Sequence, residues 1–220
     1  MWVSWSGGKD AATALAAARR AGHRVTGLLS TTTSVPSGGA EIAVHGVGTA
    51  LVQAQAAALA LPLHRVELPP ACPDGTYRER LRSALGAAGG AGVTGLVCGD
   101  LALADVRAFR EDVLDGTGVA GVFPLWGADT AALARGMLAA GLRAVVVAVD
   151  PARVPAALAG VAFDAAFLDA LAPGVDPCGE NGEFHTFVTG GPGFARDVPV
   201  AVTGTVHRDG HVQAVLAPAG

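Results

Sequence analysis

Residues 4–11 read Ser-Trp-Ser-Gly-Gly-Lys-Asp-Ala, between a short apolar run and an alanine-rich segment. This position predicts a loop that connects a strand to a helix. Its glycines let the backbone approach an anion, the first N–H groups of the helix point toward that anion, and Lys9 adds a positive charge. The pattern indicates a phosphate-binding loop. A glycine turn whose polar residues only cap the helix is the alternative.

Spacing excludes two other phosphate-binding loops. A Walker loop has a glycine five residues before the glycine of its Gly-Lys pair and a hydroxyl residue after the lysine. Val3 and Asp10 occupy those places here. The dinucleotide-binding pattern GxGxxG is also absent from this stretch.

In the first half of the chain, short apolar runs alternate with helical patterns. Strands are expected at residues 2–5, 25–32, 63–68 and 95–100, and helices at residues 11–21, 48–60, 77–88 and 101–114. Such alternation is typical of βαβ units, so the sequence predicts an α/β fold with a parallel sheet.

The second half is less regular and predicts a smaller α+β portion. Asp129 is expected to cap a helix that runs to Ala140, followed by an apolar strand at residues 142–149. Two short helices, a polar loop over residues 177–187 and a hairpin of residues 198–206 with 211–216 complete this portion. We place a domain boundary near residue 127, between a nucleotide-binding domain (1–127) and a substrate-binding portion (128–220).

Composition narrows the class of protein. The 220 residues are 51% hydrophobic, but no run of about 20 apolar residues occurs, so no membrane-spanning helix is expected. A net charge of −4 argues against a nucleic-acid partner. The three cysteines form no CxxC pair and the N-terminus does not resemble a signal peptide, which favours a cytoplasmic location. Because only 15% of residues are charged, exposed apolar surface and a homodimer are plausible expectations.

A second motif, GDLALADVRAFRE, covers residues 99–111. Asp100 follows a predicted parallel strand, at the sheet edge where α/β proteins bind ligands, and is a candidate for holding Mg²⁺. Arg107 and Glu111 share one face of the next helix, where Arg107 is a candidate for neutralising a phosphate or a carboxylate. An ordinary surface pair of arginine and glutamate is the alternative.

A third motif, PCGENGEFHTFV, covers residues 177–188. Its acidic and basic side chains favour a substrate site in which a carboxylate orients an amine or amide and His185 moves a proton. A polar loop and a metal site are the alternatives, although the segment holds few metal ligands. Cys178 has no evident base partner, so we interpret it as structural. The remaining residues considered for this site are Glu180, Asn181, Gly182, Glu183 and Thr186.

The SGGKD stretch resembles the PP-loop ATP pyrophosphatases of the adenine nucleotide alpha hydrolase superfamily, whose loop usually ends in Ser where this chain has Ala11. The order of motifs resembles the diphthine–ammonia ligase-like (diphthamide synthase) family over nearly the whole chain, to about residue 196. The blocks that carry this resemblance are SGGKD, His45-Gly46-Val47 followed by Gln55-Ala56, Gly99-Asp100 with Arg107 and Glu111, Pro124-Leu125-Trp126, residues 179–186, and Gly191-Pro192 with Phe194.

The resemblance implies a Rossmann-like domain of the adenine nucleotide alpha hydrolase (HUP) type and a ligase that uses ATP and Mg²⁺. A carboxylate substrate, small or protein-borne, would be adenylated and then joined to ammonia as an amide. ATP would bind Ser4, Ser6, Gly7, Gly8, Lys9, Asp10, Ser30, Thr31, Thr32 and Gly99. Catalysis would involve Lys9, Asp100, Arg107, Glu180, Glu183 and His185, and the substrate would contact His45, Glu111, Asn181, Gly182 and Thr186.

One departure from the family concerns the substrate. Members that amidate diphthine carry EGGE followed by an aromatic residue and an acid, whereas residues 180–185 here read ENGEFH. Branches with this form are associated with corrinoid salvage, so the acid is left open between diphthine, a corrinoid-related acid and others. A non-catalytic module that senses ATP or AMP is the rival interpretation, and the hydroxyl missing at Ala11 favours it.

Overall fold

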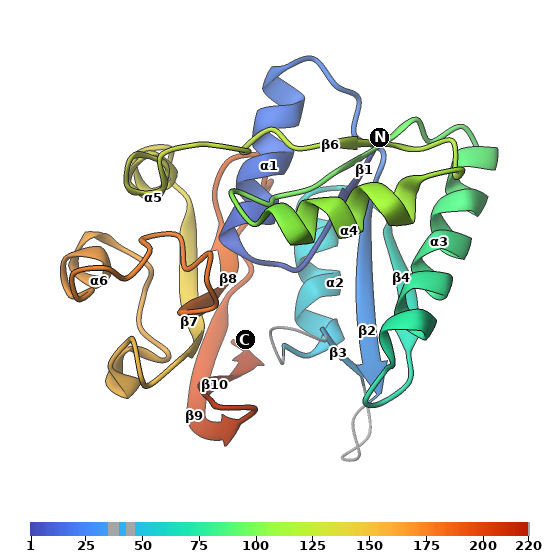
Figure 1. Ribbon diagram of the computed structural model, residues 1–220. Coiled ribbons are helices and arrows are strands. Elements are labelled where there is room, and N and C mark those ends of the chain that lie inside the picture. The colour runs from blue at the N-terminus through green and yellow to red at the C-terminus, as the bar shows by residue number, and fades with distance from the viewer. Residues whose placement is uncertain (35–39, 43–46, 220) are drawn as a thin grey trace.

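The computed structural model describes residues 1–34, 40–42 and 47–219. Its strands form two sheets that lie side by side, with helix α1 at their junction (Figure 1). The prediction of an α/β fold is confirmed. His45, predicted to contact the substrate, lies outside the described residues.

The first sheet contains five parallel strands in the order β4-β2-β1-β5-β6 within the described residues. A short strand pairs antiparallel with the end of β2. The strands are β1 (Trp2–Ser4), β2 (Gly27–Ser34), the short strand β3 (Ala40–Ile42), β4 (Leu63–Leu68), β5 (Gly95–Val97) and β6 (Ala120–Val122). The chain moves outward from β1 to β2 and β4, then returns to β5 on the other side of β1.

Helices cover both faces of this sheet. Because side chains alternate along a strand, neighbouring residues pack on opposite faces. Leu28 on β2 belongs to the apolar cluster with α1 and α2, whereas Leu29 belongs to the cluster with α3 and α4. The helices are α1 (Lys9–Arg20), α2 (Thr49–Ala58), α3 (Asp74–Gly90) and α4 (Ala104–Leu114).

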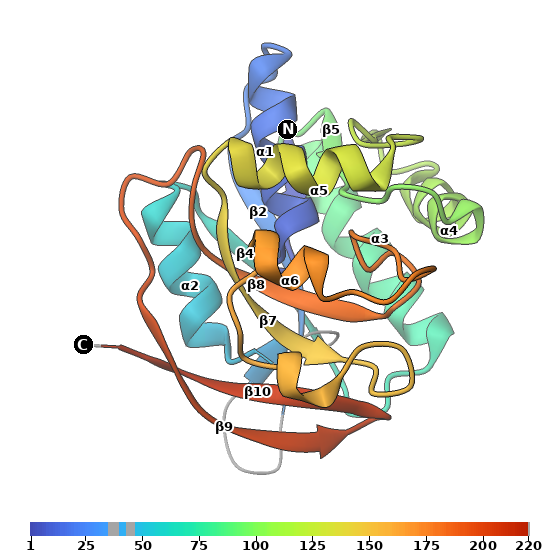
Figure 2. The ribbon, with the colours of Figure 1, turned by 90° about the vertical axis from the view of Figure 1, so that its left-hand side faces the viewer.

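The second half forms an antiparallel sheet in the order β8-β7-β10-β9 (Figure 2). Asp129 caps α5 as predicted, accepting a hydrogen bond from the N–H of Ala132 at 2.7 Å. The predicted hairpin also forms, because Asp209 and Gly210 both adopt positive φ at its turn. The elements are α5 (Thr130–Ala139), β7 (Arg143–Val149), the 3-10 helix η1 (Ala156–Leu158), α6 (Ala165–Asp169), β8 (Phe184–Gly190), β9 (Val200–Arg208) and β10 (His211–Pro218).

Two predictions from the sequence were wrong. Residues 184–187 were assigned to a polar loop but begin strand β8, which pairs with β7 and buries Phe184, Thr186 and Phe187. The polar and glycine residues before Phe184 are typical of loops, so the start of this strand was not predicted. The helix expected from residue 101 begins at Ala104, and the N–H groups of Leu101 and Ala102, which precede it, donate to the carboxylate of Glu180.

The two sheets share one apolar core. Val3 of β1 and Leu15 of α1 belong to the same cluster of buried side chains as Val146 of β7 and Phe187 of β8. The boundary near residue 127 therefore lies within a continuously packed molecule, and its place stays a prediction. No helix in the described ranges is both long and apolar enough to cross a membrane.

Candidate active site

The loops after β1 and β5 meet where the order of the parallel strands reverses. Open α/β sheets bind ligands outside the carboxyl ends of their strands at such a point. Gly99 makes the contact possible, because a Cβ there would lie 2.8 Å from the carbonyl carbon of Asp10. The first and second sequence motifs are therefore in contact.

A pocket of about 620 Å³ opens at this junction. All three sequence motifs contribute to it, the third from the turn before β8. Its lining residues are Ser4, Ser6, Asp10 and Ala11 from the first motif, Gly99, Asp100, Leu103 and Arg110 from the second, and Gly179, Glu180, Asn181, Gly182 and His185 from the third. We refer to this space as the junction pocket.

Gln55, on α2, forms hydrogen bonds with the segment that contains the SGGKD loop. Its side chain is fully buried, accepts a hydrogen bond from Nε1 of Trp5 at 3.0 Å and donates to the carbonyls of Gly7 (3.0 Å) and Val188 (2.6 Å). Gly7 has φ of +82°, and a Cβ there would lie 2.8 Å from Oε1 of Gln55. The loop therefore needs glycine for both its conformation and its packing. From the sequence, only the family resemblance pointed to Gln55.

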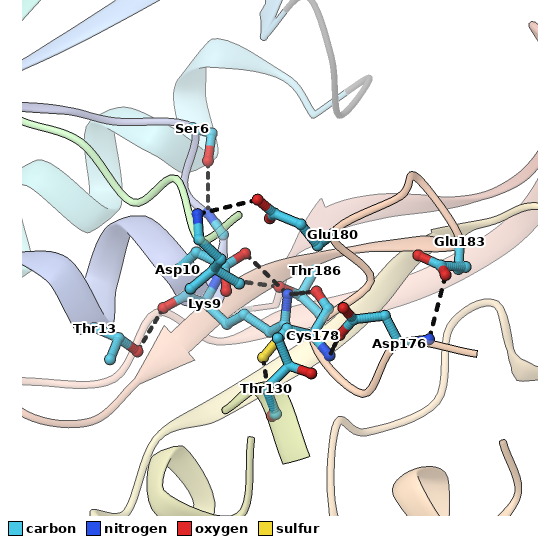
Figure 3. A network of polar contacts seen from close by, with 12 residues as sticks. Ser6, Lys9, Asp10, Thr13, Thr130, Asp176, Cys178, Glu180, Glu183 and Thr186 are labelled. Carbon is cyan, nitrogen blue, oxygen red and sulfur yellow. Dashed lines mark hydrogen bonds and ion pairs between the residues drawn. The ribbon is translucent and has the colours of Figure 1, made fainter. Parts of the chain in front are cut away.

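Lys9 is turned toward the C-terminal half (Figure 3). Its buried ammonium group donates to the backbone carbonyl of Cys178, pairs with Oδ2 of Asp10 at 2.9 Å and lies 5.1 Å from the centre of the Phe184 ring. Lys9 does not line the junction pocket. The observed contacts join the SGGKD loop to the third motif, and the predicted phosphate contact of Lys9 stays a prediction.

Two further side chains of the third motif, those of Thr186 and Glu180, bind the N-terminal half of the chain. The N–H of Lys9 donates to Oγ1 of the buried Thr186 at 3.1 Å, so Thr186 caps the start of α1. The carboxylate of Glu180 accepts hydrogen bonds from the N–H groups of Leu101 (3.0 Å) and Ala102 (2.9 Å). These contacts show both side chains in positioning roles, with Glu180 also lining the pocket.

Glu183 is fully buried and organises the turn itself. Its carboxylate accepts hydrogen bonds from the N–H groups of Asp176 (3.2 Å) and Asn181 (2.9 Å) and from the side-chain amide of Asn181 (3.1 Å), and it pairs with Arg153 at 3.0 Å. Burial alone would raise the pKa of Glu183, but the hydrogen bonds outweigh it and lower that pKa. Glu183 therefore supports the turn as a carboxylate.

His185 presents a neutral imidazole to the junction pocket. Burial, with smaller contributions from Lys9 and His211, lowers its pKa to about 4. The ring centre of His211 lies 5.9 Å from that of His185. Its Nε2 lies 3.1 Å from the carbonyl oxygen of Gly182, so the C-terminal hairpin contacts this turn.

Two carboxylates of the pocket have buried oxygens without a hydrogen-bond partner among the described residues, Oδ1 of Asp10 and Oδ2 of Asp100. Burial raises the pKa of Asp10, and Lys9 opposes the effect. Nε of Arg110 lies 3.7 Å from Oδ2 of Asp100 and also lacks a partner. No cluster of three or more His, Cys, Asp or Glu in the described ranges forms a ready metal centre.

Arg107 and Glu111 lie outside the junction pocket. Nε of Arg107 donates to Oε1 of Glu111 at 2.8 Å, and its guanidinium lies 4.8 Å from the ring centres of both Phe123 and Trp126. Arg110, which sequence reasoning left out, lines the pocket instead. The spacing showed that Arg107 and Glu111 share a face, but not which face of α4 meets the sheet edge.

Three of the residues expected to contact ATP do not line the junction pocket. Ser30, Thr31 and Thr32 lie within β2, and the hydroxyl of Ser30 donates to the backbone carbonyl of Trp5. Cys178 behaves as a structural residue, because burial raises its pKa to about 12 and its thiol donates to the carbonyl of Thr130.

Comparison with known families gives two matches that together cover most of the chain. The diphthamide synthase N-terminal domain matches residues 1–120, and the diphthamide synthase C-terminal domain matches residues 129–212. No curated protein matches the chain. The two matches follow one another in the order of the two sheets and contain the three motifs that line the junction pocket. The chain therefore belongs to the diphthamide synthase family.

Proposed function

We propose that this protein is an ATP-dependent ligase that adenylates a carboxylic acid and joins it to ammonia. The observation that carries the proposal is the convergence of the three motifs on one pocket at the strand reversal. In the first step an acid oxygen attacks the α-phosphorus of ATP, forming an acyl-adenylate and releasing pyrophosphate. Ammonia then attacks the acyl carbon, so that the amide forms and AMP leaves with the acid oxygen.

The SGGKD loop supports the nucleotide assignment. Ser4, Ser6 and Asp10 face the pocket, and α1 begins beside them. Backbone N–H groups at a helix start attract phosphate oxygens. Gln55 binds this segment by two hydrogen bonds, to Trp5 and Gly7, and β8 by a third, so the loop is held in shape before a ligand arrives. Such preorganisation supplies rate enhancement by positioning.

The acidic residues of the pocket fit Mg²⁺. The free oxygens of Asp100 and Asp10 supply two carboxylate ligands, and Mg²⁺ commonly takes one or two carboxylates together with phosphates and waters. When bound, the ion would neutralise the charge of the phosphates during attack at the α-phosphorus. Asp100 would be its principal holder, with Asp10 beside it.

His185 suits the amidation step. A pKa of about 4 leaves its imidazole neutral at pH 7, so its unprotonated nitrogen is available to accept a hydrogen bond from ammonia and orient it for attack. Glu180 and Asn181 would shape the acid side of the pocket, where Asn181 changes the donor pattern and His185, in place of an acid, changes the charge. The acid itself stays open between diphthine, a corrinoid-related acid and another carboxylate.

The experiment that tests this proposal measures products. The protein is incubated with MgATP, ammonium and a panel of acids, and AMP and pyrophosphate are measured. Formation of both products in equal amounts, dependent on one acid, is expected. A nucleotide sensor is the rival because Ala11 lines the pocket without the usual hydroxyl. Tight binding of MgATP with no pyrophosphate from any acid would favour the sensor.

Asp100→Asn tests the proposed magnesium role. The substitution keeps size but removes charge, so turnover should fall at least about 100-fold, since charge-neutralising groups in active sites contribute on this scale. The melting temperature should change little. Asp169→Asn, at an exposed position on α6, is the matched control and should retain activity. Parallel losses of activity and melting temperature in Asp100→Asn would argue for a structural carboxylate.

A further inference from the structure

Arg110 is the cation that the junction pocket offers to a ligand. We propose that Arg110, rather than Arg107, binds a phosphate oxygen of the nucleotide. The inference rests on the proposed function, because ATP is the ligand in question. It assigns a binding residue that neither the motif spacing nor the family match identifies.

The first argument concerns unpaired atoms. Among the described residues, three buried side-chain atoms lack a hydrogen-bond partner, namely Oδ1 of Asp10, Oδ2 of Asp100 and Nε of Arg110. All three belong to residues that line the junction pocket. Buried polar groups are nearly always paired, so an unpaired atom facing a pocket indicates a missing partner. The two carboxylate oxygens need a cation or a donor, whereas the Arg110 nitrogen needs an acceptor.

The second argument is that Asp100 does not already satisfy Arg110. The 3.7 Å between Nε of Arg110 and Oδ2 of Asp100 is an ion-pair contact, but it exceeds hydrogen-bond distance. An oxyanion in the pocket would accept a hydrogen bond from this nitrogen. A planar guanidinium suits the tetrahedral oxygens of a phosphate better than a lysine ammonium does.

The third argument is the contrast with Arg107 on the same helix. The guanidinium of Arg107 already donates to Glu111 and lies against two aromatic rings, and it does not line the pocket. Binding a phosphate there would require Arg107 to leave these contacts. Within the described part of the chain, Nε of Arg110 has no hydrogen-bond partner to leave.

Equilibrium binding of ATP and of adenosine tests the proposal. Arg110→Gln should weaken MgATP binding by about 10- to 100-fold, the effect of losing a charge-assisted hydrogen bond, and leave adenosine binding unchanged. The affinity of Arg110→Lys for MgATP should lie between those of Arg110→Gln and the unmodified protein. Arg107→Gln and the exposed control Arg135→Gln should bind MgATP like the unmodified protein. Unchanged MgATP binding in Arg110→Gln, or an equal loss for adenosine, would overturn the proposal. Absence of MgATP binding by the unmodified protein would instead refute the proposed function.

A double variant separates phosphate binding from simple neutralisation of Asp100. ATP is used without metal, in the presence of a chelator, so that loss of a magnesium ligand has no effect. If Arg110 binds phosphate, Asp100→Asn/Arg110→Gln should bind metal-free ATP more weakly than Asp100→Asn. If Arg110 only offsets the charge of Asp100, the double variant and Asp100→Asn should bind equally, and the proposal fails. Melting temperatures of all variants identify any that do not fold.

Discussion

His185 and Glu183 stand two residues apart, yet their surroundings give them opposite properties. The imidazole of His185 lines the junction pocket, and burial lowers its pKa to about 4. Glu183 points away from that pocket into a set of hydrogen bonds and an ion pair with Arg153. Glu183 ends the turn before β8, whereas His185 lies within the strand, so different backbone conformations orient the two side chains. His185 faces the pocket as a neutral imidazole, whereas Glu183 holds the turn as a carboxylate.

The lowered pKa of His185 predicts a pH dependence of stability. Between about pH 6.5, the ordinary value, and pH 4, the unfolded chain binds a proton at this site and the folded chain does not. The free energy of unfolding should therefore fall as pH decreases through this window, by at most about 1.4 kcal/mol per pH unit from this group. Urea unfolding at several pH values measures the slope.

His185→Gln should remove that part of the slope. His207→Gln, at an exposed position on β9, is the matched control and should leave it in place. Equal slopes for His185→Gln and the unmodified protein would show that His185 is not held neutral by the fold.

For single residues, the sequence predicted well which segments line the pocket. It predicted less well which side chains of those segments face the pocket. Asp100, Glu180 and His185 were anticipated and line the pocket, whereas Arg107 and Lys9 were anticipated and do not. The orientation of a side chain on α4 depends on how that helix packs against the sheet. That packing involves α3, whose approach to α4 no local pattern encodes.

Among the elements, β5 and α1 define the pocket because they approach so closely. Gly99 after β5 lies against the first turn of α1, with no space for a side chain between them. The strand order reverses between β1 and β5. This reversal brings the end of β5 close to the start of α1, as in other parallel sheets with helices on both faces. A single methyl group at this contact would push the SGGKD loop away from Asp100.

Gly99→Ala tests that contact. The added Cβ would lie 2.8 Å from backbone of Asp10, so the substitution should destabilise the fold by about 1–3 kcal/mol and weaken MgATP binding. Gly86→Ala, within α3 where no atom lies within 4 Å of the added Cβ, is the matched control. It should stabilise the protein by about 0.5–1 kcal/mol, because alanine favours a helix more than glycine does. Urea unfolding and nucleotide titration measure both effects, and a stable Gly99→Ala variant with normal binding would contradict this account.

Regular elements were predicted well where periodicity was strong. Strand β4 was anticipated at its observed bounds, and the helices of the first half were found within a few residues. The first residues of strand β8 were assigned to a loop, because they follow a polar stretch that contains two glycines. Its pairing with β7 and its contact with the SGGKD loop are long-range interactions that local propensity does not report.

Across the whole molecule, the two sheets act together because the SGGKD loop is bonded to both. The N–H of Val188 on β8 donates to the carbonyl of Gly7 at 2.9 Å, and Gln55 binds the backbone of both segments. Lys9 adds its contact with Cys178. The C-terminal half therefore helps to hold the SGGKD loop in place.

Substitution of Gln55 tests this coupling. Gln55→Leu leaves the Trp5 nitrogen without its partner and removes one hydrogen bond from each of the Gly7 and Val188 carbonyls, so it should lower the free energy of unfolding by about 3 kcal/mol. Gln53→Leu, exposed on the same helix, should change it by no more than about 0.5 kcal/mol. Chemical denaturation compares the two variants. A small effect at Gln55 would mean that its hydrogen bonds contribute little to holding the two sheets together.

The central claim is that an acid oxygen attacks the α-phosphorus of ATP in the junction pocket. Once the responsive acid is found, the acid labelled with oxygen-18 in its carboxylate is incubated with the protein, MgATP and ammonium, and the products are analysed by mass spectrometry. The account predicts one labelled oxygen in AMP, together with unlabelled pyrophosphate and an amide that has lost one label. AMP without label, or cleavage of ATP to ADP and phosphate, would contradict it.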